Sequence, residues 1–238
     1  MRFVFTTLLF GFTLLCRAQR IAEIEERLRL IEKPVELKYD TTGFSALPHF
    51  ENECDDENVN KWDYYHVTDL NKDGLNDLIY SGPCMPYART VIFINNGTSM
   101  KIVYDYAGSV TGIKQKSDRT IVDVFKKACC CDYNSDCIEV AIYNDSRVEE
   151  NMISFDGNTS IRLDNPIMIK ARGAIRTSPQ VDNKKRKDDC TGEPVKGNYL
   201  QQINKLTDVV QLGKEKGWSL VLYEESKQYS WVGWMKVD

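Results

Sequence analysis

Hydrophobic and polar residues alternate with a period of two along much of this chain, a pattern typical of half-buried β-strands. The alternating segments are rich in aromatic and β-branched residues, and short polar stretches separate them. No long helical pattern interrupts them, so the sequence predicts a mainly β fold with an antiparallel β domain over residues 36–170. We predict eight strands in this domain: Trp62–Val67, Asp77–Gly82, Arg89–Ile94, Met100–Tyr106, Thr120–Lys126, Ile138–Tyr143, Met152–Phe155 and Ser160–Leu163.

The connection between the third and fourth of these strands contains the clearest turn signal in the chain. Asn95, Asn96, Gly97 and Thr98 lie between two apolar runs. An Asn-Gly pair accepts the positive φ angles that a tight hairpin turn requires. We therefore expect a β-hairpin at this point.

One segment near the N-terminus has a helical pattern instead. Gln19–Lys33 carries apolar residues at helical spacing, and Pro34 would end the helix. The apolar positions are Ile21, Ile24, Leu28 and Ile31. Residues 19–35 are therefore predicted to form a short helix or a partly ordered lead-in, with its charged face in solvent.

The first 18 residues resemble a secretory signal peptide. Arg2 precedes an apolar run from Phe3 to Leu15, and Ala18 supplies a small residue at a cleavage site. The "AQ" ending is similar to that of exported proteins of the Bacteroidetes. The apolar run is too short for a stable transmembrane anchor, and no later segment is long enough. We predict an exported protein, periplasmic or extracellular, with no transmembrane segment; a lipid anchor on Cys16 is the alternative.

The charge balance bears on the choice of partners. The chain has 31 lysines and arginines against 35 acidic residues, for a net charge of −4. Removal of the predicted signal peptide would take away two arginines and make the mature chain more acidic. An acidic chain binds polyanions poorly, so nucleic acid is not expected as a partner.

Seven cysteines follow the signal segment, and in an exported protein they are expected to form disulfides with one left over. The bridges that we expect are Cys54–Cys84 and at least one from the cysteine-rich run at residues 129–137. A zinc site fits less well, because the run lacks the C-x-x-C spacing of structural zinc sites. Buried thiols are the third possibility. The seven are Cys54, Cys84, Cys129, Cys130, Cys131, Cys137 and Cys190.

Oxygen-bearing side chains are concentrated in the stretch "DLNKDGLND", which runs from Asp69 to Asp77. Such carboxylates would repel one another unless a cation neutralised them, and calcium takes six to eight hard oxygen ligands in flexible geometry. Gly74 permits the sharp reversal that would bring the early ligands together. The predicted calcium ligands are Asp69, Asn71, Asp73, Asp77 and the carbonyl oxygen of Leu75.

This stretch resembles the calcium loops of FG-GAP and VCBS-type repeats, in which D-x-N-x-D-G-x-x-D connects two strands. The resemblance implies a structural cation that braces the loop. An EF-hand is excluded, because position twelve is Tyr80 instead of glutamate and strands replace the flanking helices. No second complete copy of the motif occurs, which argues for one β domain and against a propeller. The alternative is a polar hairpin loop with an Asp-Gly turn.

The C-terminal part, over residues 171–238, resembles the bacterial SH3-like barrel. The family pattern has an opening strand ending in Arg-x-x-Pro, a strand pair, a Gly-Trp before an alternating strand, and a closing Gly-Trp. An insertion at residues 180–196 departs from that pattern and would extend the first long loop. The matching segments are Ala174–Pro179, Gly197–Leu212, Gly217–Tyr223 and Ser230–Val237.

Aromatic residues are frequent in these C-terminal segments. We expect Trp218 and Trp234 to lie in the core, and Tyr229 and Trp231 to form an exposed ligand-binding surface near a hairpin. The SH3-like resemblance implies a partner such as a cell-wall peptide or glycan, or an envelope protein.

Signals for catalysis are weak. His49 and His66 are the two histidines of the chain, and the sequence contains no G-x-S-x-G, H-E-x-x-H or P-loop motif. His66 is expected to be structural. The sequence therefore favours a non-catalytic, calcium-stabilised binding protein; the alternative is a wall-active hydrolase that uses an unrecognised pair of acidic residues.

Overall fold

The computed structural model describes residues 19–31, 37, 61–84, 87–129, 133–159, 161, 163–187 and 194–237. These residues are mainly β, with one short helix at residues 19–30, so the predicted fold class is confirmed. The chain divides into two compact units. One is Leu30–Gly157, here called the sandwich unit; the other combines Met1–Arg29 with Asn158–Asp238 and is called the ring unit.

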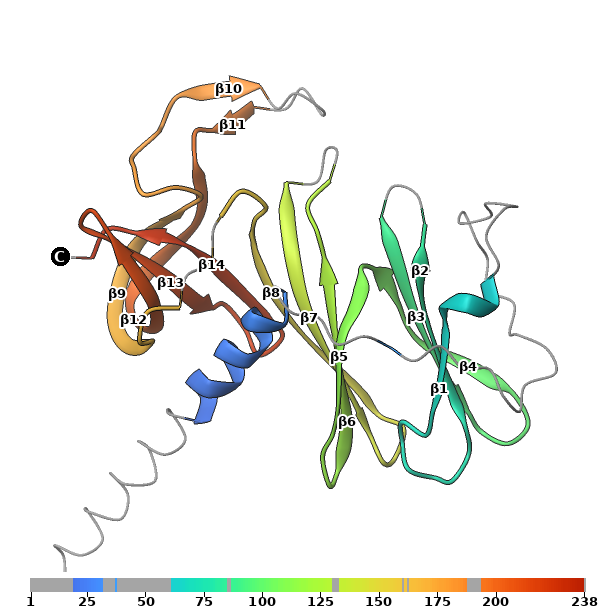
Figure 1. Cartoon of the computed structure of the whole chain (residues 1–238). Coiled ribbons are helices and arrows are strands. Elements are labelled where there is room, and N and C mark those ends of the chain that lie inside the picture. The colour runs from blue at the N-terminus through green and yellow to red at the C-terminus, as the bar shows by residue number, and fades with distance from the viewer. Residues whose placement is uncertain are drawn as a thin grey trace, which may run out of the picture. The chain divides into compact units, whose positions relative to one another are not determined.

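Eight strands are described in the sandwich unit, and Figure 1 labels them. The first four follow the 3₁₀ turn η1 (Lys61–Tyr64) and form one antiparallel sheet in chain order: β1 (Tyr65–Thr68), β2 (Asp77–Pro83), β3 (Ala88–Asn95) and β4 (Met100–Ala107). The next four also pair antiparallel in chain order: β5 (Ser109–Gln115), β6 (Arg119–Lys126), β7 (Asn134–Tyr143) and β8 (Val148–Asp156).

The two sets of strands share one hydrophobic core. Ile79, Ile92 and Tyr104 from β2, β3 and β4 pack in one cluster with residues such as Val122 and Ile138 from β6 and β7. Alternate side chains of β2 and β3 build a second cluster on the other face of the first sheet: Tyr65, Leu78, Tyr80, Val91 and Phe93. Side chains on both faces of β2 and β3 are therefore buried, which explains their nearly continuous hydrophobic sequence.

Six of the eight predicted strands overlap observed strands closely, and the predicted hairpin turn joins β3 to β4 with Gly97 at a φ of 85°. The first predicted strand begins too early, because residues 61–64 form η1 and the strand starts at Tyr65. The prediction at residues 160–163 is wrong for its described residues, since Ile161 and Leu163 lie outside any strand. Strand β5 was missed, because Gly112 and its polar neighbours dilute the alternating pattern.

The ring unit has four main strands that pair in a closed cycle: β9 (Ile167–Arg176), β12 (Tyr199–Glu215), β13 (Trp218–Glu224) and β14 (Tyr229–Met235). β9 pairs with β12, β12 with β13, and β13 with β14. The cycle closes through the pair Trp234 and Arg176, which joins β14 to β9. Within the unit each of these strands therefore has two neighbours, with β14 and β9 joined at this one pair.

The SH3-like pattern includes a strand pair, whereas the strand residues of the segment Gly197–Leu212 belong to a single strand. One strand of 17 residues, β12, occupies this region. Register shifts in its pairing with β9 lie between Tyr199 and Gln201 and between Ile203 and Thr207. Irregularities of this kind bend a strand, which allows one long segment to serve a small closed cycle.

The insertion at residues 180–196 contains a short hairpin of β10 (Lys185–Lys187) and β11 (Pro194–Lys196). Two buried polar residues hold its base. Arg176 Nη1 donates to Asn198 Oδ1 (3.0 Å) and to the carbonyl of Asp182 (3.3 Å). Asn198 Nδ2 in turn donates to Ser178 Oγ (2.7 Å) and to the carbonyl of Gln180 (2.9 Å). The base of the insertion is therefore fixed to the ends of β9 and β12.

The N-terminal helix follows the predicted pattern, with Ile24 and Leu28 buried on one face. Arg20 near its start forms an ion pair of 2.6 Å with Glu224 at the end of β13. The predicted signal segment and Pro34 lie outside the described residues. Among the residues that are described, none belongs to a helix long and apolar enough to cross a membrane.

Candidate functional site

The Asp69 loop, residues 69–76, connects β1 to β2 and is followed by Asp77, the first residue of β2. Asp77 is fully buried. Its Oδ2 accepts the backbone N–H of Leu70 and its Oδ1 accepts that of Asn95, both at 2.8 Å. One carboxylate thus fastens the start of the loop to the end of β3.

The environment of Asp77 changes its acidity. Burial raises the pKa of the Asp77 carboxyl above its ordinary value, and the nearby Asp73 carboxylate raises it further. The backbone N–H groups of Asn95 and Leu70 act in the opposite direction, because they stabilise the ionised form. The pKa of Asp77 is nevertheless raised, so these N–H groups compensate for the burial of the charge only in part.

The tip of the loop folds its own polar side chains inward. The backbone nitrogen of Asp73 donates to Asp69 Oδ1 and to Asn71 Oδ1, both at 3.2 Å. The Gly74 N–H donates to Asp69 Oδ2 at 2.9 Å, and the Leu75 N–H donates to Asp73 Oδ1 at 2.8 Å. Oxygens of Asp69 and Asn71 therefore converge on one backbone amide.

The backbone of the loop supports this curvature. Lys72 has a φ of 61° and Gly74 a φ of 88°, so two residues within three positions have a left-handed backbone conformation. Glycine adopts this conformation without strain. The predicted reversal at Gly74 is present in the structure.

The five predicted calcium ligands differ in their surroundings. Asn71 and Asp77 are buried, whereas Asp73 and Leu75 are exposed. Both Asp77 oxygens face backbone donors, as described above. Among the described residues, no three side chains of the His, Cys, Asp or Glu types are arranged to hold a metal. Asp69, Asp73 and Asp77 are of those types, so the structure does not bring these three predicted ligands together as such a group, whereas Asn71 and the Leu75 carbonyl are of other types.

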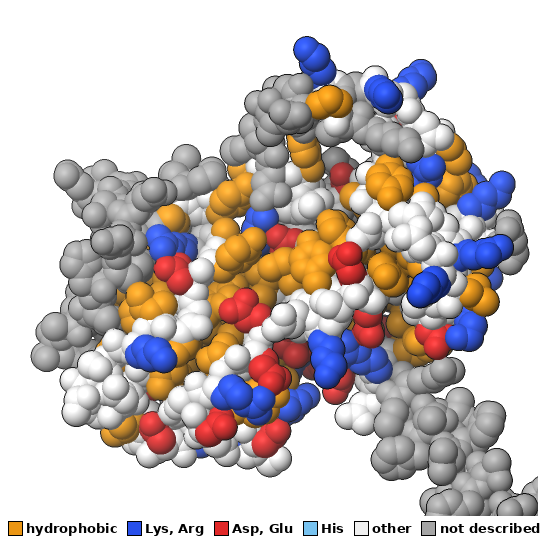
Figure 2. All heavy atoms as spheres, turned by 180° about the vertical axis from the view of Figure 1, so that it is seen from behind, with side chains coloured by type: hydrophobic (Ala, Val, Ile, Leu, Met, Phe, Trp, Pro, Cys, Tyr) orange, Lys and Arg blue, Asp and Glu red, His pale blue; other side chains and the backbone are white. Residues whose placement is uncertain are grey.

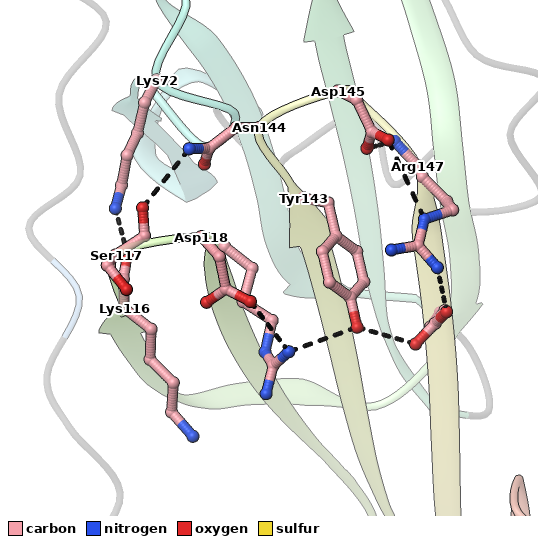
Figure 3. A network of polar contacts seen from close by, with 10 residues as sticks. Lys72, Lys116, Ser117, Asp118, Tyr143, Asn144, Asp145 and Arg147 are labelled. Carbon is pink, nitrogen blue, oxygen red and sulfur yellow. Dashed lines mark hydrogen bonds and ion pairs between the residues drawn. The ribbon is translucent and has the colours of Figure 1, made fainter.

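Two neighbouring turns of the sandwich unit contact the Asp69 loop. Lys72 Nζ donates to the carbonyl of Lys116 in the β5–β6 turn, a contact drawn in Figure 3. Asn71 Nδ2 donates to Ser146 Oγ in the β7–β8 turn at 2.9 Å. The two turns are themselves joined, since Asn144 Nδ2 donates to the carbonyl of Ser117 at 3.3 Å. Three connections of the unit thus form one polar cluster.

Beside this cluster an aromatic ring lies between two guanidinium groups. The Arg147 guanidinium lies 3.9 Å from the centroid of the Tyr143 ring, and that of Arg119 lies at 5.3 Å. The Tyr143 hydroxyl donates to Glu149 at 2.8 Å, and this hydrogen bond raises the pKa of Tyr143. Both arginines contact Tyr143, and Arg147 also forms an ion pair with Glu149, so charges of both signs meet on this surface.

A second polar cluster in the sandwich unit was not found by sequence reasoning. Lys126, Asp136 and Ser154 lie directly across from one another on β6, β7 and β8. Lys126 Nζ contacts Asp136 Oδ2 at 2.9 Å, with both side chains at least 94% buried, and Ser154 donates to Asp136 Oδ1. The Lys126 ammonium also lies 5.7 Å from the Tyr87 ring centroid and 5.9 Å from that of Tyr106.

The described cysteines divide into two kinds. Cys84 is disulfide-bonded, while Cys129 and Cys137 are present as thiols. Cys54, the predicted partner of Cys84, lies outside the described residues, as do Cys130, Cys131 and Cys190. The pairing of Cys54 with Cys84 and a bridge from the cysteine-rich run therefore stay predictions.

The C-terminal aromatic residues occupy positions other than those expected. Trp218 and Trp234 were expected in the core, but each is only half-buried. Trp231 is also half-buried and packs against the hydrophobic cluster that contains Val221 and Met235. Its indole N–H donates to Glu225 at 2.9 Å, and its ring meets that of Tyr229 edge-on at 5.1 Å. Trp231 is thus less available for a ligand than an exposed ring would be.

The histidines add no catalytic group to this picture. His66 lies half-buried on β1, and His49 falls outside the described residues.

In Figure 2, acidic and basic side chains are intermixed across the lower part of the face shown.

No protein-family model matches the chain, and no curated protein or solved structure matches it significantly.

Proposed function

We propose that this chain is an exported, non-catalytic binding protein that is stabilised by calcium and attaches to a cell-envelope component through its ring unit. The observation that carries the calcium part is the Asp69 loop, where oxygens of Asp69, Asn71 and Asp73 fold inward around backbone amides. Carboxylate and amide oxygens of this kind are the ligands that calcium prefers.

The oxygen atoms of the Asp69 loop are better explained by a bound cation than by a polar hairpin loop without an ion. The single lysine of the loop, Lys72, donates to a carbonyl of another turn and so does not neutralise the loop carboxylates. Carboxylate oxygens can accept an N–H and still bind a cation, because each oxygen offers more than one lone pair. Asp69, Asn71 and Asp73 would hold the ion, with Asp77 and the Leu75 carbonyl completing the set.

The proposed role of the ion is structural. The loop contacts the β5–β6 and β7–β8 turns, so a bound cation would brace three connections of the sandwich unit together. A ligand that binds only the folded chain raises its stability by mass action. The attachment part of the proposal rests on the half-buried aromatic residues of the ring unit, since such residues commonly dominate binding surfaces.

The test uses the exported, signal-free chain in two assays. Titration calorimetry should give about one calcium per chain, and wild-type protein should be captured by insoluble peptidoglycan. Asp73→Ala should abolish calcium binding. Asp145→Ala, which removes the same charge from the neighbouring β7–β8 turn, should retain it. Equal calcium binding by Asp73→Ala would refute the loop assignment, and a wild-type chain left in the supernatant would refute attachment to peptidoglycan.

A further inference from the structure

A small pocket opens on the ring unit, on a surface that sequence reasoning did not single out. Its volume is about 180 Å³. This is below the roughly 300–1,000 Å³ of pockets that hold drug-sized ligands, so the pocket fits one ring or one small residue. Its lining residues are Asp164, Gly213, Lys214, Glu215, Leu220 and Trp234.

Strand register explains why the pocket exists. Gly213 on β12 pairs with Leu220 on β13, which in turn pairs with Trp234 on β14. Paired residues point to the same face of a sheet, so these three positions form one row. Gly213 contributes no side chain to the row, which leaves a notch beside Leu220 and the half-buried Trp234 ring.

Charged groups surround this apolar floor. Glu215 and Lys214 end β12 and are exposed. Asp164 is held close to them, because its backbone N–H donates to the carbonyl of Leu212 at 2.8 Å. The pocket thus combines an aromatic ring with two carboxylates and one ammonium group. Glu215 also forms an ion pair with Lys216 at 3.3 Å, so the charges around the pocket are balanced and favour a neutral ligand.

We propose that this pocket binds one neutral sugar ring of an envelope glycan, an assignment that rests on the proposed function and names its ligand class. An indole ring packs against the apolar C–H face of a sugar, while carboxylates accept hydrogen bonds from its hydroxyl groups. The lysine supplies a donor for a hydroxyl or an acetamido oxygen. The ligand-contacting tryptophan is then Trp234.

Trp231 is the less suitable candidate on the same strand. Its indole N–H is already bonded to Glu225, which also accepts a hydrogen bond from Gln201 at 2.7 Å. Its ring packs against the hydrophobic cluster of the ring unit. Residues 231 and 234 lie an odd number of positions apart, so they point to opposite faces of β14.

The experiment titrates the signal-free chain with a β-1,4-linked N-acetylglucosamine trisaccharide, followed by saturation-transfer NMR and calorimetry. Trp234→Leu should weaken binding at least tenfold, and Asp164→Ala about fivefold through the loss of one hydrogen bond. One matched control lies outside the pocket: Asp208→Ala on β12, which should keep wild-type affinity. Circular dichroism checks that each variant is folded. If Trp234→Leu does not fold, the trisaccharide affinity of Asp164→Ala decides the outcome, because Asp164 is exposed.

Capture by insoluble peptidoglycan separates failure of this inference from failure of the proposed function. Wild-type chain that is captured but does not bind the trisaccharide would overturn the sugar assignment and leave attachment standing. Binding of a D-alanyl-D-alanine dipeptide in place of the sugar would also overturn it. Unchanged trisaccharide affinity in Asp164→Ala, or in a folded Trp234→Leu, would place the sugar elsewhere. A chain that neither binds the trisaccharide nor is captured contradicts both proposals.

Discussion

Asp136 and Asp73 belong to the same unit, yet their charges are compensated in opposite ways. Asp136 is buried and contacts the ammonium group of Lys126 at 2.9 Å, with Ser154 donating to its other oxygen. Asp73 is exposed, and its oxygens accept hydrogen bonds from the Leu75 N–H and from Asn71 Nδ2. One carboxylate has a full counter-charge from the chain, whereas the other has amide dipoles.

This difference separates a structural cluster from a candidate binding site. A buried ion pair with all its oxygens bonded needs no external group, and its role is to hold three strands in one register. The carboxylates of Asp69 and Asp73 accept hydrogen bonds from amide N–H groups, while Lys72 donates to a backbone carbonyl, so a cation would gain from both carboxylates. Acidic residues alone therefore do not mark a site; the partner that each carboxylate has within the chain is what distinguishes the two clusters.

The largest expected effect comes from breaking the buried pair. Asp136→Ala leaves the Lys126 ammonium buried without its carboxylate, which should lower the free energy of unfolding by about 3–5 kcal/mol. Urea denaturation would measure this change. The double variant Lys126→Met/Asp136→Leu removes both charges and should be close to wild type. A single variant as stable as the double variant would contradict the view that the pair is buried and mutually dependent.

An intermediate effect is expected at Asp77, which has backbone donors in place of a lysine. Asp77→Asn keeps one acceptor oxygen, so the N–H of either Leu70 or Asn95 loses its partner. The cost of an unsatisfied buried donor is about 1–3 kcal/mol. The measurement is urea denaturation in a chelator, which removes any contribution from calcium. Asn76→Ala is the control, because Asn76 is exposed and its backbone carbonyl is unchanged; equal losses in both variants would disprove the bracing role of Asp77.

Sequence reasoning located the elements of the sandwich unit where apolar patterning was strong. Strands β2, β3 and β4 are rich in β-branched and aromatic residues, and the Asn-Gly turn fixes their connection. The Lys126–Asp136–Ser154 row escaped detection, because its members are 10 and 18 positions apart and meet only through strand pairing. No local pattern encodes such a register.

The ring unit shows a second limit of patterning. Leu220, Val221 and Leu222 on β13 are all buried, so both faces of that strand are covered. Alternation then no longer distinguishes the core side from the surface side. The expected burial of Trp218 and Trp234 was wrong for this reason, and the pocket beside Gly213 depends on a register shift between Gln211 and Gly213 that the sequence does not reveal.

The smallest effect is expected at a carboxylate that has a counter-charge but lies nearer the surface. Asp105 accepts two hydrogen bonds from Arg89, at 2.6 and 2.7 Å, and the two side chains are 31% and 23% exposed. Water and salt screen such a pair, so Asp105→Ala should lower the free energy of unfolding by only about 0.2–1 kcal/mol. Raising the salt concentration to about 1 M shortens the screening length to about 3 Å and should reduce even this difference. Asp136→Ala provides the comparison in the same urea series, since its buried pair should keep its effect at high salt. A loss at Asp105 as large and as salt-resistant as that at Asp136 would show that burial is not what separates the two pairs.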